Sequence, residues 1–206
     1  MNYLLNNWPV VLTRLIEHMG LTVAALALAS LIALPLGWLL HRRRRLAGLV
    51  LGVLGLFYTI PSIAMIIFLI PLLGLNARAV IVALVIYCQV ILVRNVLAGL
   101  EGVSADALEA ARGMGMNRWQ IAYRVQLPLA LPVILAGLRI AAVAAVAIAT
   151  IGARFGSGGL GVLLFEGIAQ AGRMDKIWIG GLGVALLALA INRGLLAVER
   201  RFAYPS

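Results

Sequence analysis

Five long runs of apolar residues account for most of the chain. They cover residues 20–40, 46–75, 79–93, 131–152 and 177–198. A helix needs about 20 apolar residues to cross the hydrocarbon core of a bilayer. The runs are too continuous for barrel strands, which alternate over about ten residues. Pro61 and Pro71 break the second run and Arg139 interrupts the fourth, while Pro35 and Arg193 lie near the ends of the first and fifth runs. The pattern predicts an all-α fold, a polytopic helical bundle with five transmembrane helices.

The spacing of these runs predicts how the chain is organised around the membrane. Apolar residues recur at helical spacing within residues 1–19, which suits an extracytoplasmic helix lying at the membrane surface. His18 is expected to be a solvated residue of that surface helix. Residues 20–198 form the transmembrane domain, which includes a long cytoplasmic loop at 98–132. Residues 199–206 form a short cytoplasmic tail.

Composition and charge support a membrane class and give an orientation. The chain is 64% hydrophobic and 12% charged, whereas soluble domains average about 25% charged residues. Its formal net charge is +10, and 12 of its 17 basic residues lie within or beside two loops and the C-terminal tail. The positive-inside rule places these segments in the cytoplasm, with the N-terminus outside and the C-terminus inside. The arginines at 42–45 are therefore interpreted as a topology signal. Nucleic-acid or specific lipid binding is the alternative for this run, and for the protein as a whole no nucleic-acid partner is expected.

The loop at 98–132 is too polar to cross a membrane and too regularly patterned to be a simple tether. Ser104 or Asp106 can cap a short helix there. Glycine accepts positive φ without strain, so the Gly-Met-Gly stretch at 113–115 is expected to turn the chain. The first half of the loop is thus predicted to be a short helix followed by a glycine turn.

The second half of the loop predicts another helix. Asn117, with Gln120 three residues later, forms a capping box, and the helix is expected to stop before Pro128. The loop has no nucleophile paired with a base and no cluster of metal ligands, so no metal site is expected. A small-residue helix beside a basic, aromatic helix is typical of a docking surface for a cytoplasmic partner. A loop at the membrane surface without a partner is the alternative.

Within this loop the residues resemble the EAA signature of ABC-importer permeases. The family pattern is Glu-Ala-Ala, then Gly, then Ile-x-Leu-Pro, and Val125 stands here at the Ile position. The resemblance implies a five-helix permease core with a methionine-permease-like fold. It also implies that the signature is a coupling helix, held in a cleft of an ATPase subunit. The residues implied to couple are Glu109, Ala110, Ala111, Arg112, Gly113, Gly115, Arg118, Leu127 and Pro128.

Longer matches resemble the osmoprotectant branch of that family, which imports glycine betaine, choline, carnitine and related quaternary ammonium compounds. They lie at 59–62, 111–116, 127–137 and 158–161. The resemblance implies the bacterial inner membrane and four kinds of partner: membrane lipid, two cytoplasmic ATP-binding subunits, a second permease copy or paralogue, and an extracytoplasmic substrate-binding protein. No P-loop surrounds Lys176, the one lysine. This chain is therefore expected to hold no cofactor and to be non-catalytic, with ATP and Mg bound by the partner.

Polar groups inside spans are costly and tend to face the interior of a bundle. The candidates for a substrate pathway are Thr59, Ser62, Tyr87, Gln89 and Thr150. A hydrogen bond to the same helix is the alternative for the threonines and the serine, and an interhelical bond for the glutamine. Aromatic rings at Phe57, Tyr58, Tyr87 and Phe155 can attract a quaternary ammonium or simply pack. The candidates for an outer gate or a binding-protein contact are Gly156, Gly158, Gly159 and Gly161.

Three alternatives remain open at this point. The same class of importer can carry methionine or another amino acid. A secondary transporter would need ion-coupling carboxylates within the spans, and none of the seven acidic residues lies mid-membrane. A non-transporting membrane anchor or assembly factor is the third.

Overall fold

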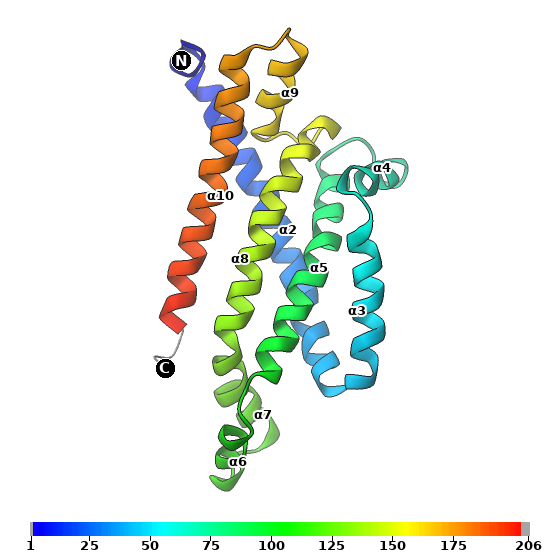
Figure 1. The fold of residues 1–206 in the computed structure, drawn as a ribbon, viewed down its shortest axis with the longest axis vertical. Coiled ribbons are helices and arrows are strands. Elements are labelled where there is room, and N and C mark those ends of the chain that lie inside the picture. The colour runs from blue at the N-terminus through cyan, green and yellow to red at the C-terminus, as the bar shows by residue number, and fades with distance from the viewer. Residues whose placement is uncertain (1, 203–206) are drawn as a thin grey trace.

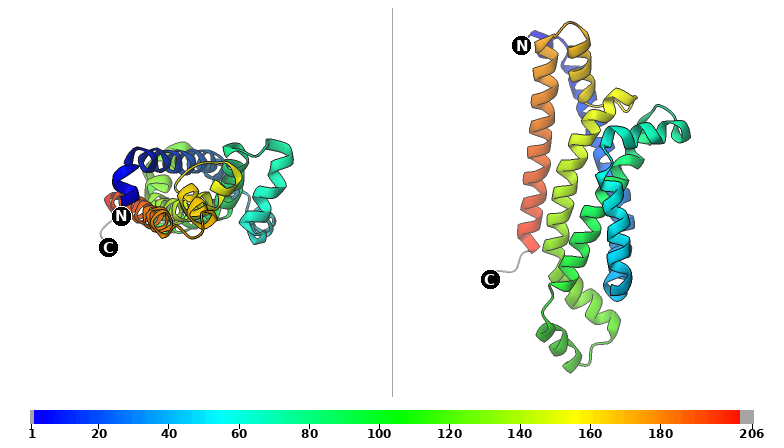
Figure 2. Two further views of the ribbon diagram at one scale, coloured as in Figure 1. Left: turned by 90° about the horizontal axis from the view of Figure 1, so that it is seen from above. Right: turned by 45° about the vertical axis from the view of Figure 1, so that its right-hand side comes forward.

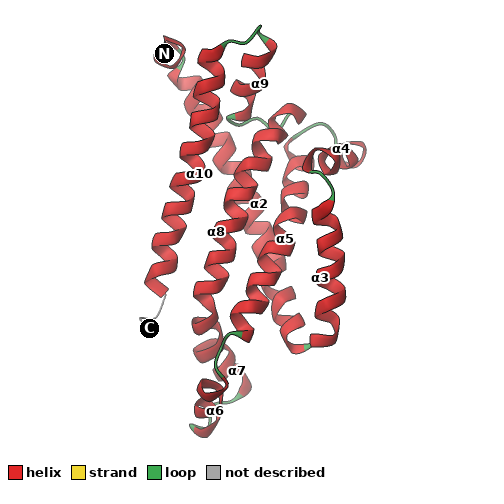
Figure 3. Ribbon diagram, viewed as in Figure 1, coloured by secondary structure: helices red, strands yellow, loops and turns green. Residues whose placement is uncertain are grey.

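The computed structural model describes residues 2–202, and each regular element in that part of the chain is helical, so the predicted all-α fold is confirmed (Figures 1 and 3). The elements are α1 (Asn2–Asn6), α2 (Trp8–Arg42), α3 (Arg44–Thr59), α4 (Ser62–Leu73), α5 (Ala77–Glu101), α6 (Ala105–Gly113), α7 (Arg118–Ile121), η1 (Ala122–Gln126), α8 (Leu127–Gly152), η2 (Ala153–Phe155), α9 (Gly161–Ala169) and α10 (Met174–Phe202).

Four helices, α2, α5, α8 and α10, are long and apolar enough to cross a membrane, and the bent pair α3–α4 supplies a fifth candidate span. Helix α5 lies at the centre of the bundle, where it packs against α2 and α8, while α10 packs against α8 (Figure 1). The core beside α5 includes rows of fully buried alanines, spaced four apart, on both neighbours. They are Ala25, Ala29 and Ala33 of α2, and Ala141, Ala145 and Ala149 of α8. Small side chains let membrane helices approach closely, which favours this packing.

The second apolar run is not one straight helix. It divides at Ile60 and Pro61 into α3 and α4, whose axes differ by 94°. Proline has no N–H, and the residue before it is pushed towards extended backbone, so the helix ends there. Both helices stand to one side of the bundle (Figure 2). Helix α3 packs one side against α5, yet it fully buries no residue and exposes Leu49, Val53 and Leu56 on its outer side. That outer apolar face has no partner within the described residues.

The structure corrects the expected boundary at residue 20. Helix α2 begins at Trp8, with Pro9 in its first turn, and continues without a break through Gly20. Residues 8–19 therefore belong to the first long helix and do not form a separate surface helix. His18, expected to be solvated, is fully buried, and its Nε2 donates a hydrogen bond to the carbonyl oxygen of Val146 at 3.1 Å.

The charged interruption in the fourth run has a partner. The Arg139 guanidinium, from α8, lies 3.0 Å from the Glu199 carboxylate and 3.3 Å from the Asn192 amide oxygen, both on α10. An unpaired charge within a span is expensive, so these contacts explain how an arginine is accommodated there. Helix α10 continues through Phe202, beyond the expected end of the span, and residues 203–206 of the expected tail lie outside the described residues.

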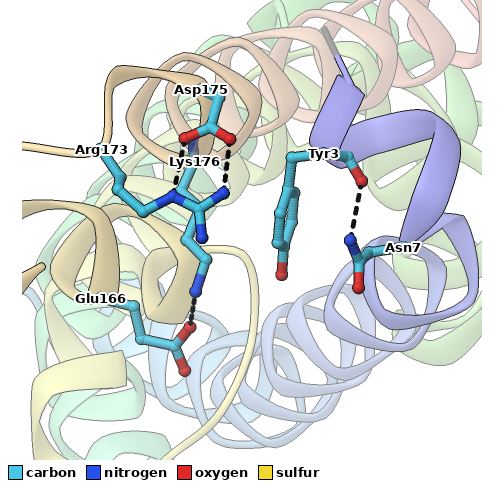
Figure 4. A network of polar contacts seen from close by, with 6 residues as sticks. All are labelled: Tyr3, Asn7, Glu166, Arg173, Asp175 and Lys176. Atoms are coloured by element: carbon cyan, nitrogen blue, oxygen red, sulfur yellow. Dashed lines mark hydrogen bonds and ion pairs between the residues drawn. The ribbon is translucent and has the colours of Figure 1, made fainter.

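A polar network ties the N-terminal helix to the segment between α9 and α10 (Figure 4). Arg173 pairs with Asp175 at 2.7 Å, and Lys176 pairs with Glu166 at 2.9 Å. The ring of Tyr3, from α1, lies 5.4 Å from the guanidinium carbon of Arg173 and 5.2 Å from Nζ of Lys176. These cation–π contacts place α1 beside the start of α10, at the end of the bundle opposite α6 and α7 (Figure 1).

Candidate functional site

Helix α6 projects from the end of the bundle (Figure 1), and most of its residues are exposed. The Ser104 hydroxyl accepts a hydrogen bond from the Ala107 N–H at 3.3 Å, which confirms the expected N-cap. Ala111 is the one buried residue of α6, and the helix packs against η1, whose Ala122 is also buried. The second alanine of the Glu-Ala-Ala segment, Ala111, thus holds the helix to the bundle. Glu109 and the first alanine remain exposed.

The turn after α6 is a Schellman motif. The N–H of Gly115 donates to the carbonyl of Arg112 at 2.9 Å, and the N–H of Met116 donates to the carbonyl of Ala111 at 3.2 Å. Gly115 has a φ of +76°, and a Cβ built on it would meet no atom within 4 Å. Glycine is therefore required here by backbone conformation. Gly113 also has open space but has no left-handed φ.

We expect Gly115→Ala to strain this turn by about 1–2 kcal/mol, because an L-residue with a side chain is disfavoured in left-handed backbone. Gly115→Asn should cost less, since asparagine tolerates that region. Amide hydrogen exchange over residues 105–121 of the purified protein measures the effect, with Gly113→Ala as the matched control. Equal protection in the Gly115→Ala and Gly113→Ala proteins would contradict this account.

The second helix of the loop begins as expected but does not end as expected. Asn117 and Gln120 form the predicted capping box, with the Asn117 Oδ1 accepting from the Gln120 N–H at 3.0 Å and the Gln120 Oε1 accepting from the Asn117 N–H at 2.8 Å. The chain then widens into the π-helical turn η1 and continues as α8 through Pro128. Proline clashes with the carbonyl four residues earlier in an α-helix, and the wider turn, in which the Leu127 N–H bonds to the Ala122 carbonyl, relieves that conflict.

Leu127 and Pro128 do not share the exposed surface of α6. Both line a cavity of about 730 Å³ between α2, α5, α8 and the end of α10. The two residues are half-buried at the start of α8. Arg112 and Arg118, in contrast, are exposed, and they remain available to a partner.

A stacked cluster joins the loop to the end of α2. The Arg42 guanidinium lies 5.4 Å from the ring centroid of Trp38 and 5.7 Å from that of Trp119, the second residue of α7. Trp119 in turn stacks on Tyr123 at 6.1 Å. Contacts between a cation and aromatic faces at these distances are attractive. Helix α7 therefore touches α2 as well as the elements next to it in sequence.

A second candidate site lies at the break between α3 and α4. A cavity of about 390 Å³ there is lined from α3, α4, α5 and α8. Three of the five residues proposed for a substrate pathway line it: Thr59, Ser62 and Tyr87. The Tyr87 hydroxyl donates to the Ile60 carbonyl, and the rings of Tyr58 and Tyr87 lie 5.7 Å apart at 59°. The break thus brings hydroxyl groups and two aromatic rings together at the side of an apolar bundle.

The other two pathway candidates lie elsewhere. Gln89 is buried, and its Nε2 donates to the carbonyl of Ala29 on α2 at 3.1 Å. The Thr150 hydroxyl donates to the carbonyl of Val146 on its own helix at 2.9 Å. Gln89 thus makes the interhelical bond, and Thr150 the same-helix bond, that the sequence allowed as alternatives to lining a pathway. Neither residue lines the cavity.

The glycine-rich loop at 156–161 is packed against α2. The Gly159 N–H donates to the Glu17 carboxylate at 2.8 Å, and a Cβ on Gly161 would lie 2.1 Å from the Thr150 carbonyl oxygen. Gly156, Gly158 and Gly159 all have φ between +78° and +86°. Gly159 and Gly161 are buried while Gly156 is exposed, so close packing within the chain explains most of these glycines. A contact of this loop with a binding protein stays a prediction, and Gly156 is the glycine most open to such a contact.

Comparison with known proteins decides the family. Residues 25–204 match the family described as "Binding-protein-dependent transport system inner membrane component". The chain belongs to this permease family. The matched residues include the core around α5, the loop of α6 and α7, and both candidate sites.

Several curated relatives of the permease cover most of its length. It is 38% identical to the carnitine transport permease protein OpuCB of Listeria monocytogenes, over 90% of this chain and 84% of that protein. It is 35% identical to the glycine betaine/carnitine/choline transport system permease protein OpuCB of Bacillus subtilis, over 98% of this chain and 92% of that protein. It is 36% identical to the osmoprotectant import permease protein OsmW of Salmonella typhimurium, over 93% of this chain and 91% of that protein.

Solved structures confirm the permease fold. An inward-facing MetNI methionine ABC transporter chain superposes with a TM-score of 0.86 at 23% identity, covering 96% of this chain and 98% of the other. An amino-acid ABC transporter solved with histidines superposes with a TM-score of 0.73 at 17% identity, covering 96% of each chain. The expected methionine-permease-like fold is thereby confirmed.

The permease also has a contact that sequence reasoning missed. The charge pattern indicates only a topology role for Arg42, yet its side chain joins α2 to α7. Trp38 and Arg42 are four residues apart and therefore neighbours on one helix face. That spacing was a usable signal for half of the cluster, but no local pattern pointed to Trp119.

Proposed function

We propose that this permease is the membrane subunit of an ABC importer for quaternary ammonium osmoprotectants such as glycine betaine, choline or carnitine. The relatives named above support the cargo class, since their names give carnitine, choline, glycine betaine or osmoprotectant transport. The exposed α6 with its buried Ala111 supports the coupling role. The importer class with an amino-acid cargo is the second candidate.

In this proposal two cytoplasmic ATPase subunits bind ATP and Mg and hydrolyse the nucleotide, while the permease itself is non-catalytic. Each ATPase holds α6 through Glu109, Ala110 and Arg112, which are exposed. Because α6 packs on η1, and η1 continues into α8, a displacement of α6 passes directly into the bundle. Rigid elements that move together in this way can produce alternating access.

The remaining partners follow from the surface of the bundle. The apolar side of α3 and α4 would be covered by a second permease copy or a paralogue, since it exposes large side chains such as Leu49, Leu56 and Phe68. Arg42–Arg45, α6 and α7 lie towards one end of the bundle, and the N-terminus and α9 towards the other (Figure 1). With the first end in the cytoplasm, as the charge distribution favours, the N-terminus and α9 face a substrate-binding protein outside.

Uptake by the reconstituted complex tests this function. The permease, its ATPase and its binding protein are placed in proteoliposomes, and uptake of radiolabelled glycine betaine, choline and carnitine is followed with and without ATP inside. We expect ATP-dependent uptake that an excess of unlabelled betaine suppresses and methionine does not. Suppression by methionine would favour the amino-acid alternative, and uptake driven by an ion gradient alone would indicate a secondary transporter.

A further inference from the structure

We propose that the cavity at the α3–α4 break is a site within the permease that binds the quaternary ammonium group of the cargo through the rings of Tyr58 and Tyr87. The inference rests on the proposed function and adds a place, where the α3–α4 break meets α5 and α8, at which the cargo is recognised. Both tyrosines line the cavity, which measures about 390 Å³. That volume falls within the range of about 300–1,000 Å³ of small-molecule pockets.

The two rings are close enough for one such group to lie near both. The centroids of Tyr58 and Tyr87 lie 5.7 Å apart, and the ring planes are tilted by 59°. Two tilted rings form an angle in which one cation can lie within about 6 Å of both centroids. Tyr87 is held in place, because it is buried and its hydroxyl donates to the Ile60 carbonyl. Tyr58 is 48% exposed, so its ring is free to contact a ligand.

The other lining residues favour a quaternary ammonium over a protonated amine. The lining contains no aspartate, glutamate or other charged side chain. A primary ammonium carries three N–H donors and a compact charge that need acceptors, best supplied by a carboxylate, when it leaves water. A quaternary ammonium has no N–H and is satisfied by aromatic faces and apolar walls. Ile91, Ala144 and Ile148 supply such walls from α5 and α8.

The hydroxyl groups of the cavity suit the polar end of the same cargo. Ser62 is the first residue of α4, at the break, and lines the cavity with Thr59. The Thr59 hydroxyl already donates to the Leu56 carbonyl at 2.7 Å, which leaves its oxygen as an acceptor. A serine hydroxyl can both donate and accept, so Ser62 can donate to a betaine carboxylate or accept from the choline hydroxyl.

A binding experiment on the purified permease–ATPase complex, without the binding protein, tests the site. Equilibrium binding of radiolabelled choline is measured for the wild type and for the Tyr58→Phe and Tyr58→Leu proteins. We expect Tyr58→Phe to bind within about twofold of wild type and Tyr58→Leu about tenfold more weakly, because only leucine removes the aromatic face. Phe57→Leu, a neighbouring exposed aromatic that does not line the cavity, should bind as wild type does.

Two further measurements keep the outcomes distinct. The neutral choline isostere 3,3-dimethylbutanol should compete poorly in the wild type, because it has the same shape without the charge. Size-exclusion chromatography shows whether Tyr58→Leu alters subunit assembly. Equal choline binding in the Tyr58→Leu and wild-type complexes would overturn this site, even where wild-type proteoliposomes import choline. Failure of the wild type to import any quaternary ammonium with ATP would instead overturn the proposed function.

Discussion

Replacing Ala111 by aspartate is expected to lower ATP-driven uptake at least about tenfold while the membrane bundle stays folded. Ala111 is 1% exposed and is the one buried residue of α6. A carboxylate at this position must either lose its water, which is expensive, or push α6 away from η1. Displacement of α6 costs less than burial of the carboxylate, because Ala111 is the one residue of α6 whose burial would be lost. Amide exchange of the isolated permease should therefore rise over 105–113, and uptake in proteoliposomes should fall.

The neighbouring residue provides the matched control. Ala110 is exposed on the same helix, so Ala110→Asp should leave amide exchange of the isolated permease unchanged. It should still weaken association with the ATPase, if α6 occupies a cleft of that subunit. Unchanged uptake in the Ala111→Asp protein would show that the packing of α6 on η1 does not transmit the motion.

Gly161→Ala is expected to destabilise the fold itself. A Cβ at this position would lie 2.1 Å from the Thr150 carbonyl oxygen and 2.8 Å from the Ala153 Cβ. Inserting a methyl group into so tight a contact typically costs about 1–3 kcal/mol. For a chain of this size that cost lowers Tm by roughly 2–12 °C. Thermal unfolding of the purified permease in detergent measures it.

Gly194→Ala separates this steric effect from helix propensity. Gly194 lies inside α10, and a Cβ there would meet no atom within 4 Å. Alanine in a helix is favoured over glycine by about 0.5–1 kcal/mol, so Tm should stay equal or rise. A Gly161→Ala protein as stable as the Gly194→Ala protein would mean that the backbone at Thr150 moves freely to make room.

Local patterns were sufficient for much of the fold and for the coupling loop. Residues 79–93 and 177–198 lie within α5 and α10, because long apolar runs have few alternatives to helix in lipid. The caps at Ser104 and Asn117 were predictable because each acts within three residues. The glycine at 115 was equally predictable, since its left-handed conformation closes a local motif.

Features that depend on distant contacts were not predictable. His18 was assigned to a surface, yet its partner, the Val146 carbonyl, lies 128 residues away in the sequence. The helix was expected to stop at Pro128, but a single wider turn allows it to continue. The cavity at the α3–α4 break combines residues of four helices. Polar and aromatic residue types within the spans indicated candidates for it, but the sequence could not show which candidates line the same cavity.

The contact between Arg42 and Trp119 gives the permease a built-in optical reporter. The chain has four tryptophans, and Trp119 is the one on the α6–α7 loop, with its ring 5.7 Å from a guanidinium carried by α2. Indole emission responds to a nearby cation and to water. Any separation of the loop from α2 during a catalytic cycle of the ATPase therefore changes the native fluorescence, and the motion can be timed without attaching a dye.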